Sequence, residues 1–140
     1  MNGSGRFGAR CFGLDWCSDL ALDQFDPADV PADGSAIVVR LVTSLPDRRL
    51  RMLSPRMELA ADGFRFCWND EAVFDGCAGT GVSVMPASAW TGRLPAAFFS
   101  TVTATLLAWR GLVPMHMSSV VHGGRAWLIA GAGGAGKSTL

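Results

Sequence analysis

The residues best suited to chemistry lie near the end of the sequence, where residues 131–138 read GAGGAGKS. This order fits a phosphate-binding pattern of a glycine, four variable residues, a second glycine, a lysine, and a serine or threonine. Glycine has no side chain, so backbone N–H groups can approach a phosphate closely and positive φ angles cost little. The segment therefore predicts a cradle for nucleotide phosphates, with a glycine-rich hairpin or tail without a ligand as the alternative.

Each residue type in this loop has an expected role. We expect Lys137 to place a compact positive charge beside the β- and γ-phosphate oxygens. We expect the Ser138 hydroxyl to ligate Mg²⁺, which prefers oxygen ligands, and Thr139 to lie near the α-phosphate. The expected cofactors are therefore ATP and Mg²⁺. The predicted phosphate-binding residues are Gly131, Gly133, Gly134, Ala135, Gly136, Lys137, Ser138 and Thr139.

Such a loop needs a strand that leads into it and a helix that follows it. Two strand-like runs, residues 115–121 and 125–131, are separated by a turn that contains the glycine pair 123–124. This arrangement predicts a β-hairpin whose second strand leads into the glycine-rich loop.

A helix is expected before the hairpin, from residue 93 onward. Pro95 suits the first helical turn, where its missing N–H would be unpaired anyway, and Gly111 suits the end. Apolar residues recur at helical spacing between them, and we expect this stripe to pack into a core rather than to hold a ligand. The stripe consists of Phe98 or Phe99, Val102, Leu106 and Trp109.

Residues 1–92 are expected to form a small β-rich domain. The β-branched run 36–46 and the shorter runs 64–68 and 81–86 predict strands, whereas the Pro-, Asp- and Gly-rich segment 23–35 predicts a connector. Tight turns are expected at Asp62–Gly63 and at Asn69–Asp70. Residues 93–140 would then be the start of a nucleotide-binding domain, so the expected fold class is α+β or α/β.

The distribution of charged residues in the sequence does not indicate a second binding site. Twelve basic and twelve acidic residues balance, which argues against a nucleic-acid partner. The densest basic group, DRRLR at 47–51, is expected to be a solvated strand edge or turn. We expect the acidic residues between positions 62 and 75 to belong to turns. These are Asp62, Asp70, Glu71 and Asp75.

The cysteines and the longest uncharged run favour a cytoplasmic protein. The four cysteines lack the spacing of zinc ligands, so we expect reduced thiols. No secretory apolar segment follows the first residues. Residues 94–109 are too short and too polar for a membrane span, so no membrane partner is expected.

Three segments resemble a family of kinases related to HPr serine kinase/phosphorylase, whose kinase domain is similar in fold to phosphoenolpyruvate carboxykinase. The segments are FGLDWCSDLAL at 12–22, LLAWRGLVPMHMSSVV at 106–121, and the hairpin into GAGGAGKSTL. The family's usual Leu-His is Met115-His116 here, and Ala132 and Gly133 stand where the family's loop often has Pro-Ser. The resemblance in order and spacing covers nearly the whole chain, but only the last third is closely motif-like.

The resemblance implies an ATP-dependent kinase that transfers the γ-phosphoryl group to a Ser or other hydroxyl on a protein or peptide. It also implies a homo-oligomer, and it places the magnesium-holding acid and the catalytic acid or base beyond Leu140. We therefore expect this sequence to be an N-terminal fragment that does not turn over ATP by itself. The alternatives are an ABC-type ATPase subunit and a non-catalytic module that binds nucleotide or peptide.

Overall fold

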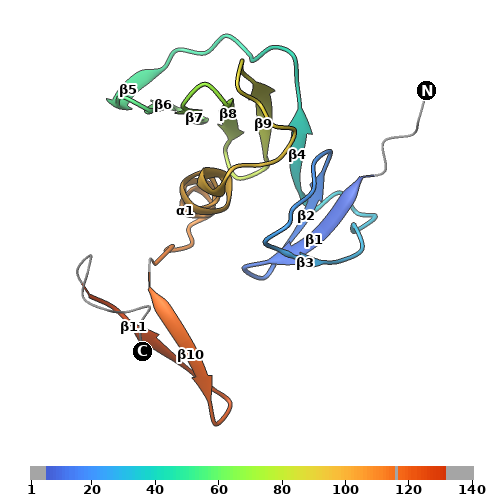
Figure 1. The fold of residues 1–140 in the computed structure, drawn as a ribbon, viewed down its shortest axis with the longest axis vertical. Coiled ribbons are helices and arrows are strands. Elements are labelled where there is room, and N and C mark those ends of the chain that lie inside the picture. Colours follow the sequence, from blue (N-terminus) through green and yellow to red (C-terminus); the bar gives the residue numbers. More distant parts are fainter. Residues whose placement is uncertain (1–5, 116, 132–140) are drawn as a thin grey trace.

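The computed structural model describes residues 6–115 and 117–131 of the chain. These residues form a mostly β structure, with a nine-stranded mixed sheet, one short helical segment that lies across a face of the sheet, and a separate β-hairpin (Figure 1). The prediction of a β-rich N-terminal region is confirmed. The described residues do not have the alternating helices and strands of an α/β fold.

The sheet has the strand order β3-β1-β2-β4-β9-β8-β7-β6-β5. Its strands are β1 (Phe7–Cys11), β2 (Leu14–Ser18), β3 (Asp26–Pro27), β4 (Ile37–Leu41), β5 (Arg51–Ser54), β6 (Met57–Ala60), β7 (Gly63–Trp68), β8 (Ala72–Cys77) and β9 (Gly81–Pro86). Strands β5 to β9 form an antiparallel meander, and β4 pairs in parallel with both β2 and β9.

The strands expected within 36–46, 64–68 and 81–86 are present as β4, β7 and β9. A two-residue turn at Ala61–Asp62 joins β6 to β7, one residue earlier than predicted. Residues 10–18, RCFGLDWCS, lie in the β1–β2 hairpin, which was not predicted from the sequence. Its turn residues Phe12 and Gly13 have φ angles of 56° and 70°.

The helix begins as a π-helical segment, η1 (Phe98–Val102), and continues as α1 (Thr103–Trp109). The hydroxyl of Thr103 donates to the Phe98 carbonyl oxygen at 2.8 Å, which satisfies this buried polar group within the wide turn. Three residues of the predicted stripe are fully buried, namely Phe98, Val102 and Leu106, whereas Trp109 is 38% exposed. The core-packing role of the helix is therefore confirmed for three of its residues.

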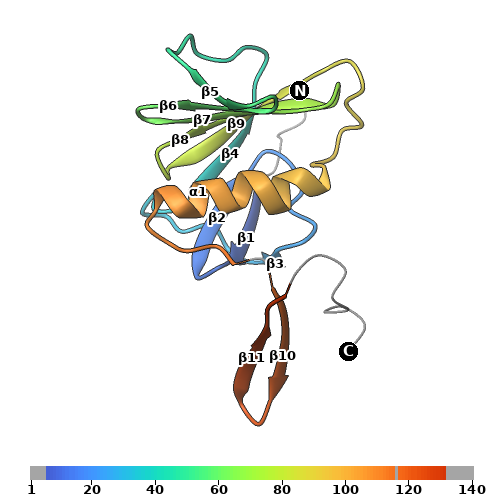
Figure 2. The ribbon, with the colours of Figure 1, turned by 90° about the vertical axis from the view of Figure 1, so that its left-hand side faces the viewer.

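One hydrophobic core joins the helical segment, which lies across one face of the sheet (Figure 2), to buried residues of β1, β2, β4, β7, β8 and β9. Phe74 of β8 lies 5.9 Å from Phe98, measured between ring centroids, and Trp16 of β2 lies 4.9 Å from Phe25. The expected domain boundary at residue 92 remains a prediction. Nevertheless, the helix after that point packs in the same core as the strands before it.

The second sheet is the hairpin of β10 (Ser118–His122) and β11 (Arg125–Ile129). Both views show it projecting away from the nine-stranded sheet (Figures 1 and 2). No helix in the described residues is long and apolar enough to cross a membrane.

Candidate functional site

The hairpin that leads toward the glycine-rich loop has the predicted form. Five residue pairs join its strands, from Ser118 opposite Ile129 to His122 opposite Arg125. Gly123 and Gly124 have φ angles of 59° and 71°, the left-handed values that a tight hairpin turn requires. Strand β11 ends two residues before the first glycine of the motif, so a strand does lead into the loop.

The loop itself lies almost wholly outside the described residues. Gly131 is the last residue described, and the predicted phosphate-binding residues after it lie beyond that part of the chain. These residues are Gly133, Gly134, Ala135, Gly136, Lys137, Ser138 and Thr139. His116, the histidine of the Met115-His116 pair, also lies outside the described residues, whereas His122 is exposed at the end of β10.

An apolar cavity of about 770 Å³ lies between the helix and the base of the hairpin. Leu107 of α1 and Leu128 of β11 line it from opposite elements, together with Leu112 and Met115 of the connecting segment. The hairpin is therefore separated from the helix by a hollow at this point rather than packed tightly against it.

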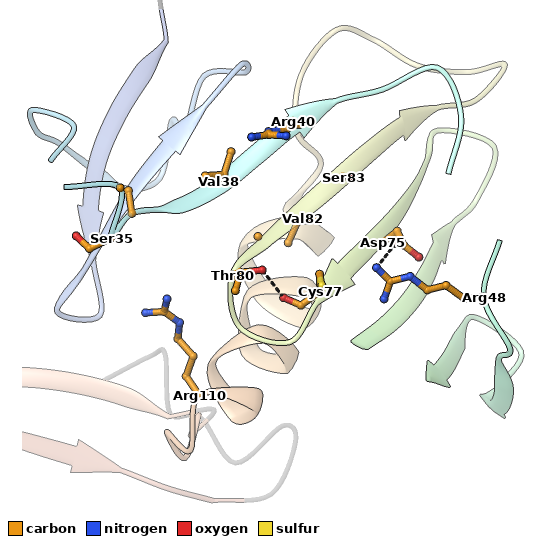
Figure 3. Close-up of a pocket in the computed structure, with 13 residues that line it drawn as sticks. Ser35, Val38, Arg40, Arg48, Asp75, Cys77, Thr80, Val82, Ser83 and Arg110 are labelled. Carbon is orange, nitrogen blue, oxygen red and sulfur yellow. Dashed lines mark hydrogen bonds and ion pairs between the residues drawn. The ribbon is translucent and has the colours of Figure 1, made fainter. Parts of the chain in front are cut away.

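A second cavity, of about 580 Å³, is lined mainly by strands β4, β8 and β9 (Figure 3). Among the described residues, three arginines from separate parts of the chain line it, whereas Asp75 is the one carboxylate in its lining. The lining residues are Gly34, Ser35, Ala36, Val38, Arg40, Arg48, Asp75, Cys77, Thr80, Gly81, Val82, Ser83 and Arg110. Sequence reasoning did not predict this site.

Asp75 organises one side of this cavity. Its side chain is only 2% exposed and accepts from Arg65 at 3.1 Å and pairs with Arg48 at 3.3 Å. The expectation that Asp75 belongs to a turn is wrong, because it lies within β8 directly opposite Arg65 of β7. A cross-strand partner of opposite charge compensates for the cost of burying this carboxylate.

Arg48 also differs from the expectation. The group DRRLR was predicted to be solvated, but the Arg48 side chain is only 15% exposed and contacts Asp62 as well as Asp75. Burial by itself would lower the pKa of Arg48. The hydrogen bond to Cys77 and the charges of Asp75 and Asp62 outweigh this effect, so the pKa is raised and the guanidinium stays charged.

Arg110 reaches the cavity from the end of the helix. Its Nε donates to the carbonyl oxygen of Gly79 in the turn between β8 and β9, which fixes the side chain beside the strand ends. Figure 3 shows Arg110 and Arg48 entering from opposite sides, with β8 and β9 between them. The helix end thus supplies a charge to a site built mainly on the sheet.

One signal for part of this site is present in the sequence. Once a hairpin joins FRFCW to AVFDG, the register that pairs Phe66 with Phe74 places Arg65 opposite Asp75 on the other face. Arg48 and Arg110 lie far from this pair in sequence, and only the tertiary fold brings them together. In the part of the chain that is described, no three His, Cys, Asp or Glu residues gather as metal ligands.

Comparison with known proteins gives no matching family model, no curated protein of significant similarity and no solved structure of significant similarity.

Proposed function

We propose that the chain belongs to an ATP-binding phosphotransferase related to the HPr serine kinases, and that residues 131–139 hold the nucleotide phosphates. The observation that carries this proposal is the sequence GAGGAGKS placed directly after strand β11 (Arg125–Ile129). A strand followed by a glycine-rich loop and a Lys-Ser pair is the setting in which backbone N–H groups bind phosphates.

In this proposal Lys137 and Ser138 of the loop have separate roles in binding the nucleotide. Lys137 neutralises the oxygens of the β- and γ-phosphates as negative charge moves during transfer. The Ser138 hydroxyl supplies a hard oxygen ligand that suits Mg²⁺, and the ion would neutralise charge on the phosphates. The acceptor is a Ser or other hydroxyl on a protein or peptide.

Lys137 gives the proposal a sharp test because it is the only lysine in the sequence. Lys137→Ala removes the single ammonium side chain of the chain, and Ser138→Ala removes only a hydroxyl. We expect Lys137→Ala to weaken the binding of a fluorescent ATP analogue at least tenfold. Ser138→Ala should instead reduce the difference in affinity between magnesium and EDTA conditions.

A matched control is available on the hairpin. Arg125 is an exposed cation at the start of β11, outside the predicted cradle, so Arg125→Ala should leave the affinity within about twofold. Equal affinity of the Lys137→Ala variant and the unmodified chain would overturn the proposed role of the loop.

Transfer of label from γ-³²P-ATP, measured with the full-length protein rather than with this 140-residue chain, separates the kinase from its two rivals. Label on a serine-containing peptide supports phosphotransfer, whereas release of labelled phosphate without any acceptor indicates an ATPase. Tight ATP binding with neither product indicates a nucleotide-binding regulatory module and overturns the kinase proposal.

A further inference from the structure

The cavity bounded by Arg40, Arg48 and Arg110 is lined, among the described residues, by strands of the nine-stranded sheet, their connecting segments and the end of α1. It lies on the nine-stranded sheet, where Arg40 belongs to β4 and strands β9 and β8 separate it from Arg48 (Figure 3). We propose that it binds the phosphate group of a small molecule, or free phosphate, independently of ATP.

The strand register places polar groups in a row across one face of the sheet. Arg40 lies opposite Ser83, Ser83 opposite Asp75, and Asp75 opposite Arg65. Directly opposite residues point to the same face, and neighbouring strands lie about 4.8 Å apart. Ser83 therefore stands between the charge of Arg40 on one side and the Asp75–Arg48 pair on the other.

A second row of paired residues, next to the first on the same face of the sheet, forms the floor of the cavity. Val38 lies opposite Gly81, and Gly81 lies opposite Cys77. A Cβ atom at Gly81 would meet the Val38 carbonyl oxygen at 2.4 Å, so only glycine fits there and the floor stays open. The hydroxyls of Ser35 and Thr80 line the side of the floor from which Arg110 enters.

The charges favour an anion. In the described part of the chain the lining contains three guanidinium groups and one carboxylate, and Asp75 is already engaged by Arg48 and Arg65. Arg40 has no ion pair or side-chain hydrogen bond to any other described residue. Asp33 precedes the lining residues Gly34 and Ser35 in the sequence, and its carboxylate accepts from the Ser35 amide at 2.9 Å. Arg40 is therefore available to a ligand.

Shape distinguishes a small phosphate-bearing ligand from an acidic peptide. Arginine forks recognise phosphate oxygens through pairs of charge-assisted hydrogen bonds. A volume of about 580 Å³ lies within the range of small-molecule pockets, and the arginines surround one hollow. An extended acidic peptide would instead need charges distributed along a groove.

The test uses the 140-residue chain carrying Lys137→Ala, so that phosphate bound at the proposed nucleotide loop does not contribute. Inorganic phosphate and glycerol 3-phosphate are titrated by calorimetry in 0.15 M NaCl, with glycerol as the uncharged comparison. We expect saturable binding of both anions and none of glycerol. Tighter binding of glycerol 3-phosphate identifies a phosphorylated small molecule as the source, and equal binding identifies free phosphate.

Arg40→Gln and Arg110→Gln should each weaken binding about tenfold, as expected for the loss of one charge-assisted contact. Arg40→Gln removes no ion pair or side-chain hydrogen bond within the described residues, so its thermal midpoint should not change. Arg51→Gln is the matched control, because Arg51 is an exposed strand arginine of the same sheet outside this cavity, and its affinity should stay within twofold.

Three results would overturn the proposal: no saturable binding of either anion, equal weakening by Arg51→Gln and Arg40→Gln, or tighter binding of a tetraglutamate peptide than of phosphate. None of these results bears on ATP binding at Lys137. Conversely, failure of ATP to bind at the loop would leave the phosphate titrations interpretable.

Discussion

The nine-stranded sheet and the β10–β11 hairpin use similar apolar residues with opposite results. Trp16 and Phe98 in the sheet and its helix are 0% exposed, whereas Trp127 and Val121 in the hairpin are 59% and 76% exposed. Most strands of the sheet have two neighbours, and a helix covers one face. Within residues 6–115 and 117–131, the hairpin strands pair only with each other.

The difference shows that a strand-forming sequence does not by itself bury its side chains. Gly123, Gly124 and the five-pair ladder suffice to define the hairpin, but an isolated two-stranded hairpin is marginally stable in water. Stability in this chain should therefore be concentrated in the sheet and helix. The hairpin should contribute mainly by leading the chain into the proposed nucleotide loop.

The largest expected effect is the loss of a core ring. Phe98→Ala removes a fully buried side chain that contacts Phe74 and Phe99, and should lower the free energy of unfolding by roughly 4 kcal/mol. Urea denaturation measures this change. Phe7→Ala is the control, because Phe7 is 49% exposed and its loss should cost less than about 1 kcal/mol. Equal costs would show that the helix is not part of the core.

The next effect concerns the buried charge. Asp75→Asn keeps the volume but leaves Arg48 and Arg65 without their shared carboxylate, and should destabilise the chain by about 3 kcal/mol. This value lies at the lower end for a broken buried pair, because both arginines retain some solvent contact. Asp62→Asn should cost about 0.5 kcal/mol or less, since Asp62 is 65% exposed. If the Asp75→Asn chain unfolds at the same urea concentration as the unmodified chain, the ion pairs of Asp75 with Arg48 and Arg65 do not stabilise the fold.

Much of the fold could be predicted from local patterns. The alternation in FRFCW, the β-branched run at 36–46 and the glycine pair at 123–124 each correspond to an observed strand or turn. The β1–β2 hairpin was missed because its turn places Phe12 at a positive φ of 56°, a conformation that phenylalanine rarely adopts.

The two candidate sites also differ in how far local sequence patterns could predict them. The nucleotide motif is contiguous, so its residues can be named from sequence, although they lie outside the described residues. The sheet cavity depends on Arg40, Arg48 and Arg110, which are brought together by strand order and by the helix end. No local pattern encodes the parallel insertion of β4 between β2 and β9, so this site could not be predicted without the fold.

A smaller effect tests the wide helical turn. Thr103→Val removes the buried hydroxyl that donates to the Phe98 carbonyl oxygen at 2.8 Å, and should cost about 1 kcal/mol in urea denaturation. Thr105→Val removes an exposed hydroxyl bond to Thr101 of the same length, and water replaces it at little cost. A larger loss for Thr105→Val than for Thr103→Val would contradict the packing of η1 against the sheet.

The smallest effect is expected in the hairpin. Trp127→Ala removes a large ring that is 59% exposed. The free energy of unfolding of the whole chain, measured by urea denaturation, should therefore fall by less than about 0.5 kcal/mol. Hydrogen exchange should give the same contrast, with amides of β10 and β11 exchanging much faster than those of β8. Strong protection across residues 120–130 would remove the distinction between the two regions.

The most direct test of the central claim is the acylation rate of Lys137 with and without MgATP, read by mass spectrometry. The chain has no other lysine, and the α-amino group of Met1 serves as an internal reference in the same sample. The account predicts that saturating MgATP slows acylation of Lys137 at least tenfold while the Met1 amine reacts unchanged. An unchanged rate at Lys137 would contradict the assignment of residues 131–139 as a nucleotide site.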